Sequence, residues 1–285
     1  MKKLFSLVIC VMAVLFVGCE PNAPEVIGVF SVSETKQVTF SPGNLQYTRS
    51  TGTWSFASTQ WEVIGTDNVI GGSVSSDKYG DSKEGTALAD KVDLFGWSTR
   101  STNCGVSISA NSETYYGSFV DWGKNKIGND APNTWRTLSY DEWKYLLNTR
   151  PNASSLKGVA QVNGVNGLIL LPDSWTCPAG VTFMSDFHSS DGVDYYAAYQ
   201  TFTADQWAKL EDAGAVFLPA AGGRFLPAAG YRCSGVNGVQ YIGYYWSATE
   251  CDIPNAFHLR FYSEAAGVYG SSRDCGHSVR LVKDL

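Results

Sequence analysis

Histidine is the first residue to test for catalysis, because imidazole is the usual general base near neutral pH. The chain of 285 residues has three, His188, His258 and His277. None lies in a motif such as GxSxG or HExxH, which would place a nucleophile or a metal beside it. The sequence therefore predicts no catalytic histidine.

The segment AFHLRFY, residues 256–262, alternates like a β-strand with two different faces. We assign its apolar set to a core: Phe257, Leu259 and Phe261. The opposite set is polar or amphipathic: His258, Arg260 and Tyr262. Large polar and aromatic side chains on one strand face are typical of contact residues. The predicted ligand-binding set comes from this C-terminal stretch: Tyr241, Asp252, His258, Arg260, Tyr262, Tyr269, Asp274 and His277.

Carboxylates could serve glycoside hydrolysis or bind calcium. Two acidic pairs have structural explanations instead, at the start of one predicted helix and on the solvated face of another: Asp141 with Glu142, and Glu211 with Asp212. No DxDxDG spacing occurs, and residues 78–85, KYGDSKEG, supply only Asp81 and Glu84. We therefore predict no metal site and no cofactor, while calcium stays possible without support.

The cysteines do not form a recognisable framework. Five follow Cys19 along the chain: Cys104, Cys177, Cys233, Cys251 and Cys275. An odd number cannot all pair, and no CxxC pair of the zinc-binding kind is present. Their pairing is left open.

The N-terminus reads as an export signal. Residues 1–18 combine two lysines, an apolar run too short to span a bilayer and a small residue, and Cys19 follows directly. LFVGC resembles a bacterial lipobox, so we predict a signal peptide, lipidation at Cys19 and a tether over residues 19–27. We expect an outer-membrane lipoprotein exposed at the cell surface, touching the membrane through the lipid anchor only. The alternative is a plain secretory signal.

Charge excludes one class of partner. The formal net charge is -6, and removal of the signal with its two lysines makes it -8. Nucleic-acid binding requires clustered Lys and Arg, so we expect no nucleic-acid partner.

Two helices are predicted over residues 138–150 and 201–214. Each begins with a capping box, Ser139 with Glu142 and Thr203 with Gln206. In each, a Trp is followed three residues later by a Leu, which puts both on one buried face. Strand candidates follow at residues 167–172 and 215–219, and further strands at 30–47, 243–249, 255–263 and 277–282. This order predicts one α+β domain over residues 28–285.

Several segments in order resemble a known family: VTFSPGNLQY, KVDLFGWST, WRTLSYDEWKYLLNTR, GLILLPDSW, AGAVFLPAAG, GYYWSAT and GHSVRLV. They are similar to exported Bacteroidetes proteins whose domain is similar to the Fibrobacter succinogenes major paralogous domain. The resemblance implies a C-type-lectin-like fold with two main helices, short antiparallel strands and long loops. It extends more remotely to the formylglycine-generating enzyme. Cys251 and Cys275 do not sit in that enzyme's motif, so its activity is not implied.

Members of this family are similar to the variable proteins of diversity-generating retroelements, in which adenines of a C-terminal cassette are randomised. An AAC codon varied at its adenines gives Cys, His, Tyr or Arg among others, but never Lys, Glu or Gln. Residues 210–282 contain no lysine, and their three cysteines stand at non-framework positions. Gln240, Glu250 and Glu264 do not fit the scheme. The resemblance thus implies a variable ligand-binding region over about residues 230–282.

Residues 217–232 contain two consecutive copies of one octapeptide, FLPAAGGR and FLPAAGYR. The family pattern needs one copy, so the second resembles a tandem slip. We expect the first copy to stay joined to the preceding helix, with Phe217 and Phe225 competing for one strand position.

The sequence favours a binding protein without catalytic residues. The expected partner is a protein or glycan ligand on a cell or phage surface. Two alternatives stay open: an enzyme of the formylglycine-generating or glycosidase kind, and the subunit of a surface filament.

Overall fold

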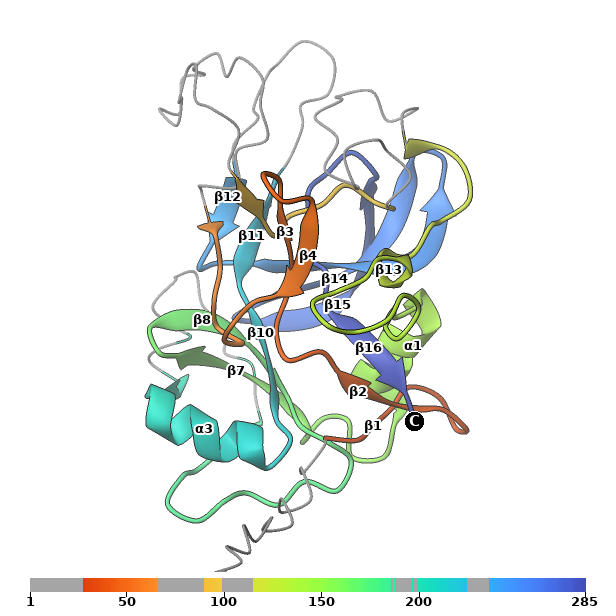
Figure 1. Cartoon of the computed structure of the whole chain (residues 1–285). Helices are drawn as coiled ribbons and strands as arrows, with labels where there is room; N and C mark the ends of the chain where they lie inside the picture. The colour runs from red at the N-terminus through yellow and green to blue at the C-terminus, as the bar shows by residue number, and fades with distance from the viewer. Residues whose placement is uncertain are drawn as a thin grey trace, which may run out of the picture.

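The computed structural model describes residues 28–65, 90–98, 115–185, 187, 196, 199–224 and 236–285. These residues form four small β-sheets and two α-helices, so the chain is a sheet-rich α+β protein (Figure 1). Within these ranges no helix is both long enough and apolar enough to cross a membrane. The predicted signal peptide, Cys19 and the tether lie outside the described residues.

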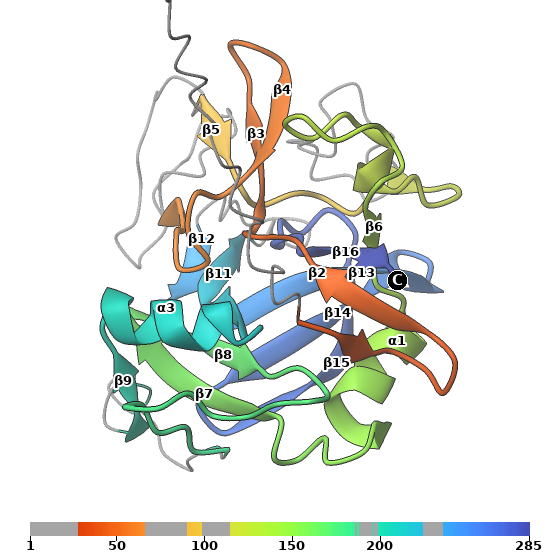
Figure 2. The same ribbon diagram turned by 60° about the horizontal axis from the view of Figure 1, so that its bottom comes forward.

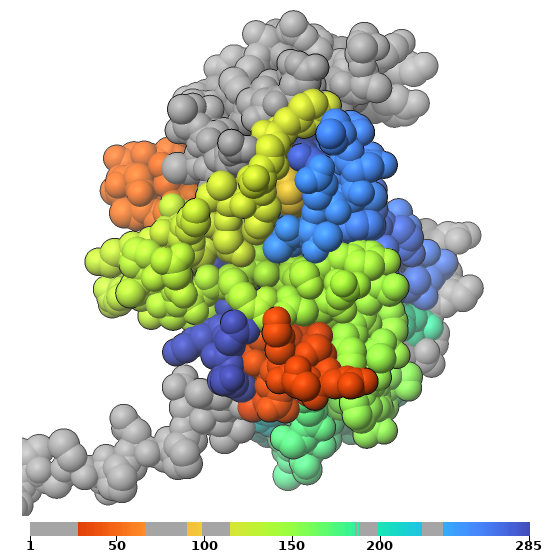
Figure 3. Space-filling view, turned by 90° about the vertical axis from the view of Figure 1, so that its right-hand side faces the viewer, coloured from red at the N-terminus to blue at the C-terminus, as the bar shows by residue number. Residues whose placement is uncertain are grey.

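The N-terminal and C-terminal strands of the described chain share one sheet, in which β16 pairs with β2. One sheet has the antiparallel order β1-β2-β16-β6, with these bounds: Phe30–Ser31, Gln37–Phe40, Leu281–Asp284 and Arg136–Thr137. Figure 3 shows the N-terminal strands (red), the C-terminal strand (dark blue) and the region around α1 (green) side by side on one face. The predicted strand at 277–282 is partly wrong, because the regular strand begins only at Leu281.

A second antiparallel sheet lies beside a tryptophan-rich core. Its order is β4-β3-β5, with these bounds: Thr53–Phe56, Leu45–Thr48 and Lys91–Val92. A 3-10 turn at Trp122–Lys124 adds Trp122, which is fully buried with Trp97 and Phe95. Because the aromatic rings come from segments distant in sequence, they join these pieces into one body.

The first predicted helix is present and shorter than expected. Helix α1 covers Tyr140–Lys144, and a π-helical turn at Tyr145–Thr149 continues it. Both halves of the predicted capping box with Ser139 and Glu142 are formed, which satisfies backbone donors at the helix start. Trp143 and Leu146 are fully buried, as the spacing predicts.

The second predicted helix, α3 at Ala204–Asp212, covers a sheet of order β10-β8-β7-β9 (Figure 2). The strand bounds are Val216–Pro219, Val165–Leu170, Lys157–Val162 and Thr201–Phe202. Its capping box with Thr203 and Gln206 is also formed, and Gly214 ends the helix with φ +90°. Trp207 and Leu210 are fully buried against this sheet.

The first octapeptide copy connects two sheets. Its residues form β10 and then, after Ala220, strand β11 at Ala221–Arg224. Strand β11 pairs with β12, Val236–Val239, in antiparallel fashion and touches the start of β13 in parallel. The prediction that the first copy stays joined to the helix is confirmed. The second copy, residues 225–232, lies outside the described residues.

A meander of three long strands completes the fold. Strands β13, β14 and β15 cover Gly243–Asp252, Asn255–Tyr262 and Ala265–Ser272, and each pairs antiparallel with the next. The first two confirm predicted strands. Sequence patterning did not predict β15, because its residues AAGVYGSS show no apolar alternation.

Candidate functional site

The β13–β15 meander has a different environment on each face. Leu259 and Phe261 point into the main core with Tyr245, while Ala256 and Trp246 belong to the tryptophan-rich core. Residues of β14 therefore alternate between two packed layers rather than between a core and solvent. The two-faced pattern predicted for residues 256–262 is confirmed, but its polar face is covered over part of its length.

Phe257 departs from the prediction that it belongs to the buried core. It lies on the face of Leu259 but is only partly buried. Its ring packs against Tyr140 of α1, with the ring centroids 4.2 Å apart. Phe257 therefore sits at the margin of the core, against Tyr140 of α1.

Two histidines meet a serine on the opposite face. The Oγ atom of Ser271 lies 3.2 Å from Nδ1 of His258 and 2.8 Å from Nε2 of His277. Nδ1 of His277 lies 3.0 Å from the carbonyl oxygen of Gly276, which can only accept a hydrogen bond. Nδ1 of His277 therefore carries the proton, Ser271 donates to Nε2, and His258 donates to Ser271.

Aromatic rings enclose this histidine pair. The ring of His277 stacks on Tyr244, with centroids 5.0 Å apart, and contacts Trp246 at 4.2 Å. Burial, together with the nearby positive charge of Arg260, lowers the pKa of His258 to about 3. His258 is therefore neutral at physiological pH, and Ser271 links it to His277. Its serine–histidine contact is geometrically that of a nucleophile and base, yet the closed chain of bonds also explains it structurally.

Three predicted ligand contacts are thereby corrected. His258, Asp274 and His277 are buried, with exposed fractions of 3%, 7% and 0%. His277 is drawn inward because its backbone N–H and C=O both pair with Phe95, a residue distant in sequence. Strand alternation could not reveal this pairing, so these three residues do not form part of an exposed contact surface.

The partly exposed end of the same face carries a tyrosine–arginine cluster, which comprises Tyr244, Arg260, Tyr262 and Tyr269. The Arg260 guanidinium lies over the Tyr269 ring, 4.2 Å from its centroid, and 5.8 Å from the Tyr262 centroid. Each such cation–π contact is worth about 0.5–2 kcal/mol. Burial raises the pKa of Tyr244, so its hydroxyl stays protonated beside the cation.

Gly267 makes this arrangement possible. It lies directly opposite Arg260 in the β14–β15 register. A Cβ atom at this position would lie 3.1 Å from the ring of Tyr269, which leans over the glycine. The absence of a side chain therefore leaves room for the Tyr269 ring beside the guanidinium.

Arg260 has no acidic partner in the part of the chain that the structure describes. Among the described residues no ion pair or hydrogen bond engages its guanidinium, and its Nε atom is buried without a partner there. Buried donors are normally satisfied, and an unsatisfied one requires an explanation. Arg260 as a whole residue is only partly buried, so an acceptor from outside can still reach its guanidinium.

The remaining two predicted residues lie elsewhere. Tyr241 is 49% exposed in the turn before β13, and Asp252 is exposed at the other end of that strand. Ten residues of β-strand span about 30 Å, so Tyr241 and Asp252 cannot touch one small ligand together. The Asp252 carboxylate accepts a hydrogen bond from the Asn255 side chain at 2.7 Å.

Sequence reasoning missed three members of this face: Tyr244, Gly267 and Ser271. Tyr244 was counted within the framework segment GYYWSAT, and the other two lie on the unpredicted strand β15. The sequence did offer one signal: Tyr244 and Trp246 are two residues apart, so they lie on the same face of their strand. It could be used only once the register between β13 and β14 was known.

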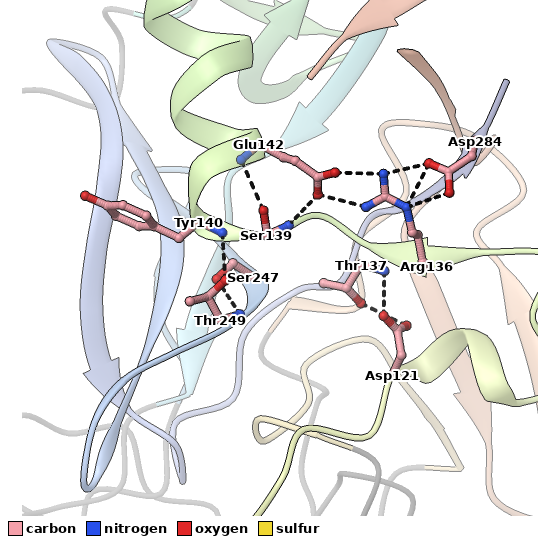
Figure 4. A network of polar contacts seen from close by, with 9 residues as sticks. All are labelled: Asp121, Arg136, Thr137, Ser139, Tyr140, Glu142, Ser247, Thr249 and Asp284. Atoms are coloured by element: carbon pink, nitrogen blue, oxygen red, sulfur yellow. Dashed lines mark hydrogen bonds and ion pairs between the residues drawn. The ribbon is translucent and has the colours of Figure 1, made fainter. Parts of the chain in front are cut away.

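A second polar cluster lies between α1 and the C-terminal strand (Figure 4). Arg136 donates to both carboxylate oxygens of Glu142, at 2.8 and 2.9 Å, and also to Asp284 at 2.7 Å. Glu142 also accepts the backbone N–H of Ser139 at 2.8 Å, as part of the capping box. Glu142 is thus fully engaged in holding the helix start to β6 and β16, which supports its predicted structural role.

Neighbouring groups in this cluster are equally occupied. Asp121 accepts the backbone N–H groups of Gly123 and Thr137, both at 2.9 Å, and burial raises its pKa. The backbone N–H of Tyr140 donates to Thr249 at the end of β13, at 3.0 Å (Figure 4). The network therefore ties α1 to the meander that carries the tyrosine–arginine cluster.

Two of the residues that do not fit codon randomisation have structural roles. The Gln240 side chain accepts the backbone N–H of Asn166 at 2.7 Å, and Gln240 has φ +68°. Glu250 forms an ion pair with the buried Arg273, which stacks on Trp97 at 4.6 Å. Such roles give a physical reason for these positions to stay fixed.

The cysteines show no pairing where they are described. Cys177 and Cys251 are exposed, Cys275 is buried, and these three form no disulfide with one another. Cys104 and Cys233 lie outside the described residues. Within the described ranges no group of three or more His, Cys, Asp or Glu side chains could hold a metal ion.

Comparison of the chain with protein-family models, with curated proteins and with solved structures finds no match.

Proposed function

We propose that the chain is a cell-envelope lipoprotein whose C-type-lectin-like domain binds a ligand through the partly exposed end of the β13–β15 face that carries Arg260. Its site is the tyrosine–arginine cluster, with Tyr241 and Asp252 at the flanks. The observation that carries the proposal is the partly exposed Arg260, held between tyrosine rings and without an acidic partner among the described residues. Tyrosine and arginine are the residues that most often dominate binding energy at interfaces.

The proposed fold and family rest on the resemblance of ordered segments. These segments fall on regular elements of an α+β body: VTFSPGNLQY on β2 and β3, WRTLSYDEWKYLLNTR on β6 and α1, and GYYWSAT on β13. Because the segments resemble the family in their order and also form helices and strands of this chain, they favour the same architecture as that of the family. Export and lipidation at Cys19 belong to the same proposal, since the N-terminal signal carries them.

The binding experiment compares the native chain with Arg260→Ala, Tyr262→Ala and Tyr269→Ala on arrays of glycans and on intact bacterial cells. Each change should weaken binding by about tenfold or more. Lys144→Ala is the matched control, because Lys144 also lies over a tyrosine ring, Tyr140, at 5.0 Å. Tyr140 packs against Phe257, on the other face of the sheet. Equal losses in the control would contradict the assigned face.

Diversification by a retroelement is a separate part of the proposal. It requires a reverse transcriptase gene near the coding sequence and a near-copy of its 3' end that differs only at adenines. Sequencing the neighbourhood tests this directly, and the absence of both elements would remove diversification while leaving ligand binding in place. Protease shaving of intact cells tests surface exposure in the same strain.

A further inference from the structure

We infer that the tyrosine–arginine cluster is a carboxylate site, and that its ligand is an acidic sugar whose carboxylate binds Arg260 while its ring lies against the neighbouring tyrosines. This inference rests on the proposed function, which leaves the ligand class open. It identifies the group that the ligand must carry.

The first argument is the state of the guanidinium. Arg260 is a permanent cation, and its Nε is buried without a hydrogen-bond partner. Nothing in the described part of the chain neutralises it, whereas Arg273, another arginine of this region, forms an ion pair with Glu250. A planar guanidinium on a partly exposed residue matches a carboxylate, which can accept two parallel hydrogen bonds.

The second argument is the number of negative charges that the ligand can carry. Residues 210–282 contain no lysine, and the chain as a whole carries a formal net charge of -6. A ligand with several negative charges would meet one isolated cation on an acidic protein, which opposes binding. A single carboxylate neutralises the single guanidinium, so a monovalent acid fits better than a phosphate chain or a nucleic acid.

The third argument is the surface around the cation. Tyr244, Tyr262 and Tyr269 place three aromatic rings around Arg260, each with an apolar body and a polar hydroxyl. A sugar ring presents the same combination of an apolar face and hydroxyl groups. Gly267 leaves space for Tyr269 beside Arg260, so the platform is held in place before a ligand arrives.

The position of the cluster disfavours an extended peptide. Arg260 lies on β14, whose two neighbours β13 and β15 already use its backbone hydrogen-bonding groups. A peptide that added as a strand would need a free sheet edge. The cluster offers only side chains on the face of the sheet, which suits a compact ring-shaped ligand.

The test uses the full chain and three probes of matched shape: galacturonic acid, its uncharged methyl ester, and galactose. Ligand-observed NMR titration should show galacturonic acid binding at least tenfold more tightly than either neutral probe. Arg260→Gln should remove this preference. Arg260→Lys should recover only part of it, because an ammonium keeps the charge but not the planar fork. Gly267→Ala should weaken all three probes by displacing the Tyr269 ring, and Lys144→Gln should change nothing.

The outcomes separate this inference from the proposed function. Equal binding of the acid and its methyl ester, or a preference that survives in Arg260→Gln, overturns the carboxylate site. Glycan or cell binding that depends on Tyr262 and Tyr269 but ignores acidic sugars overturns it while the proposed function stands. Selective binding of an acidic peptide in place of acidic sugars also overturns it. If neither glycans nor cells bind, both proposals fail.

Discussion

Removal of the first octapeptide copy, residues 217–224, is expected to leave a folded and slightly more stable protein. In the native chain Phe217 is fully buried against Trp207, with ring centroids 5.6 Å apart, and its backbone N–H donates to Gln60. In the shortened chain Phe225 would follow Val216 directly and could make the same contacts. The second copy then supplies the complete β10–β11 segment.

The magnitude follows from the connection between β11 and β12. Eleven residues separate Arg224 from Val236 in the native chain, and three would remain, Cys233, Ser234 and Gly235. Loop-closure entropy scales with the logarithm of loop length, so this shortening should stabilise the fold by about 1 kcal/mol. A three-residue hairpin loop with glycine last also suits the left-handed position of the usual turn.

The native chain uses its first copy for a physical reason. A shift by eight residues would put Gly223 and Arg224 in the places of Ala215 and Val216, which are 2% and 6% exposed. A buried arginine without a partner costs several kcal/mol, so the shifted register is strongly disfavoured. Consequently Phe217→Ala should cost the full 3–5 kcal/mol or so of a buried phenylalanine, and Phe225→Ala almost nothing.

Urea unfolding followed by tryptophan fluorescence measures each variant. Removal of residues 225–232 is the matched control, since the two shortened chains differ only in having Tyr231 or Gly223 at one strand position. The chain that keeps Tyr231 should be more stable by about 1 kcal/mol, because glycine weakens a strand. A loss of about 3 kcal/mol or more on removing residues 217–224 would refute the idea that the copies are interchangeable.

Three further outcomes are expected. Between pH 6.5 and about 3, the unfolded state binds a proton at His258 that the folded state excludes. The free energy of unfolding should therefore fall with decreasing pH, by up to about 1.4 kcal/mol per pH unit. In acid titrations of unfolding, His258→Asn should flatten this slope, and an unchanged slope would contradict the assignment. Glu142→Ala should lower the free energy of unfolding by about 2–3 kcal/mol in the same urea assay. Asp284→Ala, at a side chain 63% exposed, should lower it by under about 1 kcal/mol. Equal losses would contradict the assigned roles. Gly222→Ala should cost about 2 kcal/mol or more, since φ is +70° and the new Cβ would lie 2.4 Å from the Asn237 carbonyl oxygen. The equivalent change at Gly230 should cost little, and similar losses at both glycines would show that the copies share the strand position.

The helices were predictable because their signals are local. A capping box and a Trp–Leu pair three residues apart lie within one or two turns, so Ser139, Glu142 and Trp143 identify α1 without reference to the rest of the chain. The π-helical turn that follows carries no such local signature, and the predicted helix was therefore too long. The strands before and after α3 were found for the same reason, since their apolar runs end at a proline.

The candidate site was predictable only in part. Alternation in residues 256–262 correctly placed Arg260 and Tyr262 opposite the core. It could not show that the backbone of Phe95 would pair with His277, whose ring packs against the ring of His258. It also gave no sign of β15, whose small residues hold Tyr269 and Gly267 beside the cation.

The sequence by itself determined the two helices, about half of the strand positions, the α+β class and the polar face of β14, because each depends on residues within a few positions of one another. Only the tertiary structure decided which polar residues are buried and which are reachable. Backbone pairing between distant segments closes one half of that face over His258 and His277. The register of β15 leaves the other half to Arg260 and its tyrosines.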